Sequence, residues 1–93
     1  MDRGVVAARR RFPFQGQAIE ERAARDDEFR ELCTDFADAQ AELRRWEQSS
    51  DPRRDERCSE YLQLVDDLAS EIEIALERAA IIPFHRPSPK SRT

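Results

Sequence analysis

Ser49-Ser50-Asp51-Pro52 is the stretch that decides the fold we expect, because it separates two long helical patterns. Proline has no amide hydrogen and pushes the residue before it out of helical geometry, so a helix that reaches this point ends. The same proline suits the first turn of a new helix, with Asp51 as its N-cap. We therefore predict one helix over residues 26–48 and a second over residues 52–82.

Both predicted helices carry apolar side chains at coiled-coil heptad spacing, which favours two helices packed side by side. A short connection makes such helices antiparallel. In the register that aligns both patterns, Trp46 faces Cys58 and Phe36 faces Leu68. The predicted core of this helical hairpin consists of Phe29, Leu32, Phe36, Leu43, Trp46, Tyr61, Val65, Leu68 and Ile72. The predicted fold class is all-α, built on an antiparallel two-helix hairpin.

The residues before the first predicted helix do not follow its pattern. The heptad frame breaks upstream of Phe29, although residues 17–25 are good helix formers. These residues either continue the first helix or form a separate short N-terminal helix. Both arrangements fit the sequence.

Charge is segregated along the chain. The net charge is -4, yet residues 1–14 carry four arginines against one aspartate, and residues 83–93 carry three basic side chains and no acidic one. The body between them therefore has a net charge of -10. We predict three parts, namely a flexible basic N-terminal arm over residues 1–16, a helical hairpin domain over residues 17–82 and a disordered basic C-terminal tail over residues 83–93.

The second predicted helix has more apolar surface than one partner helix can cover. Leu62 and Leu76 widen its apolar stripe, and Cys33 borders the seam on the first helix. We predict that these three side chains form an association face, through which two hairpins pair as a four-helix homodimer. Alternatively, residues 5–25 fold back and cover the same face.

Side chains with catalytic or metal-binding chemistry do not form a recognisable constellation in the sequence. Cys33 and Cys58 lie 25 residues apart without the spacing of zinc ligands, and His85 follows the predicted helices. We therefore expect no catalytic, cofactor-binding or metal site, no cofactor and no enzyme activity. Two unpaired cysteines indicate a reduced, cytoplasmic setting, and no apolar run is long enough to span a membrane.

The layout of the heptads resembles that of the YdcH-like family of short bacterial helical hairpins, over about residues 26–78. The residues that carry this similarity are Asp27-Glu28-Phe29-Arg30-Glu31-Leu32, Asp35-Phe36, Leu43, Glu47, Glu60-Tyr61, Asp67-Leu68 and Leu76. The resemblance implies a small bacterial helical protein. It brings no active site to carry over.

Our leading interpretation of function is a non-enzymatic protein–protein interaction module that self-associates and binds another protein. The alternative is a nucleic-acid or anionic-surface binder that uses the basic terminal arms. Arg9, Arg10 and Arg11 would then form an anion-binding arm, next to Phe12 and Phe14. Nucleic acid is the less favoured partner, because the acidic body repels phosphate backbones.

Overall fold

The computed structural model describes residues 2–81, and the regular structure within this range is entirely helical. Its elements are α1 (Arg3–Arg11), the short 3₁₀-helix η1 (Pro13–Gln15), α2 (Gly16–Arg25), α3 (Asp27–Glu47) and α4 (Arg54–Ile81). The predicted all-α class is therefore confirmed. The predicted disordered tail over residues 83–93 lies outside the described residues.

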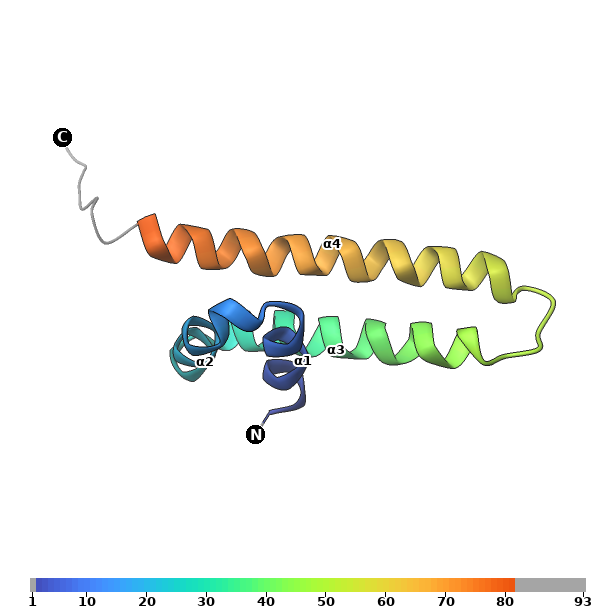
Figure 1. Cartoon of the computed structure of the whole chain (residues 1–93), viewed down its shortest axis with the longest axis horizontal. Coiled ribbons are helices and arrows are strands. Elements are labelled where there is room, and N and C mark those ends of the chain that lie inside the picture. Colours follow the sequence, from blue (N-terminus) through green and yellow to red (C-terminus); the bar gives the residue numbers. More distant parts are fainter. Residues whose placement is uncertain (1, 82–93) are drawn as a thin grey trace.

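The two longest helices, α3 and α4, lie side by side and run in opposite directions along the long axis of the molecule (Figure 1). α3 begins after Asp26, whose carboxylate accepts a hydrogen bond from the amide of Phe29 at 3.1 Å. Such a cap satisfies an amide that has no partner inside the helix. The observed bounds of α3 lie within one residue of the predicted bounds, 26–48, at each end.

The loop between α3 and α4 differs slightly from the prediction, because α4 begins at Arg54. The Asp51 carboxylate accepts a hydrogen bond from the amide of Arg53 at 2.7 Å, and this holds a turn before the helix. That hydrogen bond also lowers the pKa of Asp51. Across the loop, Nε of Arg54 donates to the carbonyl of Glu47 at 3.0 Å, where the end of α3 attracts a positive charge.

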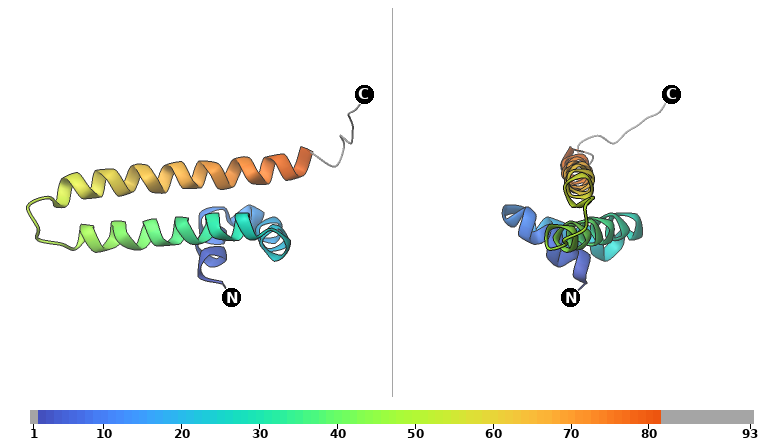
Figure 2. Two further views of the ribbon diagram at one scale, coloured as in Figure 1. Left: turned by 180° about the vertical axis from the view of Figure 1, so that it is seen from behind. Right: turned by 90° about the vertical axis from the view of Figure 1, so that its right-hand side faces the viewer.

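Residues 3–25 fold back onto the α3–α4 pair. α1 crosses α3, and α1 and α2 lie at the end of the pair away from the loop (Figure 2). The predicted flexible arm over residues 1–16 is wrong for residues 3–16, because Val5 and Ala8 give α1 an apolar face that is buried. Two arrangements were open for residues 17–25, and the structure shows the separate short helix, α2.

The position of α2 is fixed by Arg22, which links three elements. Its Nε donates to Asp26 at 2.7 Å, and its Nη1 donates to the carbonyl of Ala75 in α4 at 3.0 Å. The same guanidinium lies 5.4 Å from the centre of the Phe29 ring. One side chain therefore holds α2 against the start of α3 and against α4.

The hydrophobic core lies at the end of the molecule that α1 and α2 cover. In α3 the fully buried side chains lie between Phe29 and Ala39, and in α4 they lie between Val65 and Leu76, among the side chains that the structure describes. Of the predicted core, four residues are fully buried, and the other five are half-buried: Leu32, Leu43, Trp46, Tyr61 and Leu68. The buried core also contains residues outside the predicted set: Val5, Ala8, Ile19 and Ala23 from α1 and α2, Cys33 and Ala39 from α3, and Ala69 and Leu76 from α4.

Candidate interaction surfaces

The association face predicted from Leu62, Leu76 and Cys33 is wrong for two of its three residues. Cys33 is 0% exposed and Leu76 is 6% exposed, and both belong to the core that α1 and α2 complete. The alternative, in which residues 5–25 cover this face, is the arrangement that the structure adopts. Leu62 precedes Leu76 in α4 and so lies nearer the loop, and it remains 52% exposed.

Burial also decides the chemistry of Cys33. Removal from solvent raises the pKa of its thiol to about 11, and the negative charge of Asp2 acts in the same direction. The thiolate is the nucleophilic form of cysteine, so a thiol with this pKa is unreactive at neutral pH. Cys33 is therefore a packing residue, as free buried cysteines commonly are.

The half of the α3–α4 pair nearer the loop has no third helix beside it among the described residues (Figure 1). One flank of the pair contains a shallow hollow of about 340 Å³, which we term the α3–α4 groove. Its lining residues are Asp35, Asp38, Ala39 and Glu42 from α3, and Tyr61, Leu64 and Leu68 from α4. An apolar floor with an acidic rim on α3 is thus open to solvent, and Leu64 is 42% exposed.

The neighbours of Ala39 in this groove agree with the predicted register within about a helical turn. That register places Ala39 opposite Val65, and the groove brings it together with Tyr61, Leu64 and Leu68. The individual layers, such as Trp46 over Cys58, stay predictions.

Charges along this flank change sign from one end to the other. Arg57 precedes Leu64 by seven residues and Arg45 follows Asp38 by seven, so each pair shares a helix face. Both arginines lie toward the loop. Arg45 contacts Glu42 at 3.0 Å and Arg57 contacts Glu60 at 2.8 Å, and the latter hydrogen bond raises the pKa of Arg57.

The other end of the same flank is acidic. Asp35 and Asp38 line the groove on the side away from the loop, and Asp38 contacts Arg3 of α1 at 2.6 Å. Both side chains of this ion pair are more than half exposed, so the pair contributes little to stability. The flank as a whole has a basic end, an apolar centre and an acidic end.

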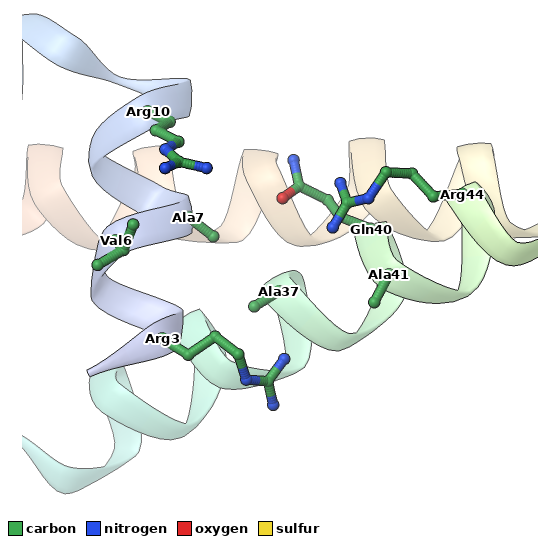
Figure 3. A pocket seen from close by; sticks show the side chains of 8 residues that line it. All are labelled: Arg3, Val6, Ala7, Arg10, Ala37, Gln40, Ala41 and Arg44. Atoms are coloured by element: carbon green, nitrogen blue, oxygen red, sulfur yellow. The ribbon is translucent and has the colours of Figure 1, made fainter. Parts of the chain in front are cut away.

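A second hollow, of about 420 Å³, lies between α1 and α3 on another side of α3, and we term it the arginine groove. Its lining residues are Arg3, Val6, Ala7, Arg10, Ala37, Gln40, Ala41 and Arg44, none of them acidic (Figure 3). The guanidinium groups of Arg10 and Arg44 point toward one another, with Gln40 between them (Figure 3). Within residues 2–78, neither Arg10 nor Arg44 forms an ion pair.

The three arginines of the predicted anion-binding arm have different neighbours in the structure, although Arg9 and Arg10 line one shallow hollow together. Arg9 contacts Glu20 of α2 at 2.6 Å, and Arg11 lies 4.9 Å from the centre of the Phe12 ring. Only Arg10 lines the arginine groove. Its spacing of seven from Arg3 could have indicated a shared helix face, but no signal in the sequence connects either residue to Arg44.

Metal-binding clusters and membrane-spanning helices are absent from the part of the chain that the structure describes. No group of three or more His, Cys, Asp or Glu side chains in the described part of the chain could hold a metal ion. None of the described helices is both long and apolar enough to cross a membrane. His85 lies outside the described residues.

The chain matches no protein-family model, and the comparisons with curated proteins and with solved structures found no match. The resemblance to the YdcH-like family therefore stays a prediction. What the molecule offers to a partner is defined by its own surfaces, among them the α3–α4 groove and the arginine groove.

Proposed function

We propose that this chain is a non-enzymatic protein–protein interaction module that self-associates as a homodimer. In the proposed dimer the α3–α4 grooves of two copies face each other, so that two copies of the α3–α4 pair form a four-helix arrangement. The observation that carries the proposal is the unfinished helical layer near the loop. There the predicted core residues Leu43, Trp46 and Tyr61 stay half-buried, because only two helices are present.

A second copy would complete this layer. Full burial of a leucine or an aromatic side chain contributes roughly 1.5–3 kcal/mol, and the groove presents Leu64, Leu68 and Tyr61 together. Side chains from an opposing helix would pack into the α3–α4 groove. Packing of this kind is how four-helix bundles bury their apolar faces.

Charge favours a second copy of this chain as the occupant. In a twofold symmetric dimer the same surface meets itself, so it must be complementary to itself. If the two copies run antiparallel, the end of the flank with Arg45 and Arg57 in one copy lies over the end with Asp35 and Asp38 in the other. Arg45, Arg57 and Asp38 would then exchange their exposed ion pairs within the chain for pairs between the copies. The loop half is also nearly neutral, with six acidic side chains and five arginines over residues 40–64, whereas the body carries a net charge of -10.

A non-enzymatic role fits the way in which the reactive side chains are used. Cys33 fills the core as a protonated thiol, and Asp26 caps α3. A reduced thiol in the core also fits the proposed cytoplasmic location. The alternative function, anion binding by a basic N-terminal arm, loses support because Arg9 and Arg11 contact other side chains of the chain.

Sedimentation equilibrium at micromolar concentration tests the dimer, because one copy has a mass of 10.9 kDa. We expect a dimer for the unmodified chain and a monomer for Leu64→Glu. Leu62→Glu is the matched control, since two residues along an α-helix turn the side chain by roughly 200° and move it to the opposite flank. A monomer for the unmodified chain, or equal loss of dimer in both variants, would refute the proposal.

A charge reversal tests the antiparallel arrangement separately. Arg45→Glu/Arg57→Glu makes both ends of the flank acidic, and Asp35→Arg/Asp38→Arg makes both ends basic. We expect each double variant to be a monomer alone and an equimolar mixture of the two to form a heterodimer. Failure of the mixture to associate would contradict the antiparallel pairing, even if the unmodified chain is a dimer.

A further inference from the structure

The arginine groove stands out electrostatically from the rest of the molecule. Eight arginines of the described chain form ion pairs with carboxylates, as expected for a protein rich in acidic side chains. Arg10 and Arg44, like Arg11 and Arg25, form none of these pairs, and Arg10 and Arg44 line the same hollow and face each other across it (Figure 3). Like charges that converge without a counter-charge repel one another, and a bound anion relieves this repulsion.

We propose that the arginine groove binds the phosphate group of a small phosphate monoester. The proposal does not depend on self-association, because the two grooves use different residues of α3. Ala37, Gln40, Ala41 and Arg44 line the arginine groove, whereas Asp35, Asp38, Ala39 and Glu42 line the α3–α4 groove.

The number of uncompensated charges favours a phosphate monoester over a carboxylate. Asp38 offsets the charge of Arg3 through their ion pair. The charges of Arg10 and Arg44 therefore remain uncompensated in the groove. A phosphate monoester carries a charge of about -1.5 to -2 at neutral pH, which matches two guanidinium groups, whereas a carboxylate carries one negative charge. Guanidinium groups also bind phosphate oxygens through two parallel hydrogen bonds, and the Gln40 amide can donate a further one.

The rest of the groove suits the organic part of such an ester. Val6, Ala7, Ala37 and Ala41 are small and apolar, so a compact hydrophobic group can lie against them. A hollow of about 420 Å³ is of the size that binds small molecules. A nucleic-acid strand is a poorer fit, because its successive phosphates would lie over a strongly acidic body.

Phenyl phosphate is the probe for this site, and phenyl sulfate is its isosteric singly charged control. Each is titrated into the full chain while backbone amide resonances are followed by NMR. We expect phenyl phosphate to shift the amides of Ala7, Ala37, Gln40 and Ala41 and to bind at least about tenfold more tightly than phenyl sulfate. Binding should weaken as the pH falls below about 6, because the phosphate then takes up its second proton.

Two double variants with equal net charge separate this site from general attraction of anions. Arg10→Gln/Arg44→Gln should lose at least about tenfold in affinity for phenyl phosphate, the cost of removing two charge-assisted contacts. Arg11→Gln/Arg25→Gln removes two exposed arginines that do not line the groove, and it should bind as the unmodified chain does.

Three results would overturn the proposal. The first is an equal loss of affinity for phenyl phosphate in both double variants. The second is equal affinity of the unmodified chain for phenyl sulfate and phenyl phosphate. The third is tighter binding of a short single-stranded oligonucleotide than of phenyl phosphate at the same amides, which would assign the groove to nucleic acid. Circular dichroism of both double variants should match that of the unmodified chain, since Arg10 and Arg44 are exposed.

Discussion

Gly4 of α1 lies against the backbone of α3 so closely that a Cβ atom at this position would be 2.5 Å from the amide nitrogen of Thr34. The same atom would be 2.6 Å from the carbonyl carbon of Cys33. Backbone atoms inside a helix cannot move aside as the end of a flexible side chain can. Glycine at position 4 is therefore what permits α1 to cross α3 at this distance.

Gly4→Ala should destabilise the protein, because the added methyl group pushes α1 away from α3. Overpacking of this kind typically costs about 1–3 kcal/mol, which chemical denaturation followed by circular dichroism can measure. Gly16→Ala is the control, since its Cβ would meet the Nε of Arg9 at 3.2 Å, and that side chain can shift. Alanine inside α2 should be neutral or stabilising by about 0.5–1 kcal/mol. Equal stabilities of the two variants would contradict the close crossing.

Ile72 and Ile74 form a matched pair of isoleucines on α4. Ile72 is fully buried in the core, whereas Ile74 is 47% exposed. Ile72→Ala should cost about 2–5 kcal/mol of unfolding free energy, and Ile74→Ala no more than about 0.5 kcal/mol. The comparison checks which side of α4 faces α3, and a larger loss for Ile74 would show that the helix is rotated.

Asp26 should make stability depend on pH in acid. The hydrogen bond from Arg22 and, to a smaller extent, the one from the Phe29 amide lower the pKa of Asp26 in the folded chain below the ordinary value of an aspartate. A carboxyl group with a lowered folded pKa stabilises the fold above its unfolded pKa, and this contribution is lost as the pH falls through the folded pKa. The denaturant midpoint should therefore fall as the pH is lowered from about 4.

Asp26→Asn is the informative variant for this effect. It keeps an oxygen that can accept the hydrogen bond from Phe29, but it loses the charge that Arg22 contacts. The difference in midpoint between the variant and the unmodified chain should be largest near neutral pH and should shrink in acid. A difference that stays constant down to the lowest pH would show that Asp26 acts through its shape alone.

The α3–α4 pair could be predicted from the sequence because its determinants are local and periodic. Heptad spacing identifies the buried face of each helix, and Pro52 with Asp51 places the turn between them. Phe29, Phe36, Val65 and Ile72 are accordingly buried in the structure. The start of α4 was predicted at residue 52, before its observed start at Arg54, because a cap and a short turn compete for the same few residues.

The candidate surfaces were predicted less well, since the exposure of a helix face depends on which other segments of the chain pack against it. Leu76 and Leu62 belong to the same apolar stripe in the sequence, yet only Leu76 is covered. Similarly, Arg9, Arg10 and Arg11 are adjacent in the sequence but have different neighbours. Arg9 contacts Glu20, Arg10 lines the arginine groove, and Arg11 lies over the ring of Phe12. Neighbours on a helix point in different directions, about 100° apart, so a run of arginines is not a single site.

The sequence by itself determined the all-helical class and the bounds of the long helices, because proline, capping residues and heptad spacing act over a few residues. Only the tertiary structure decided that α1 and α2 cover Cys33 and Leu76, and that Arg10 and Arg44 line the same groove. Those contacts join segments with no shared periodicity. They depend on how closely α1 can approach α3, which Gly4 permits.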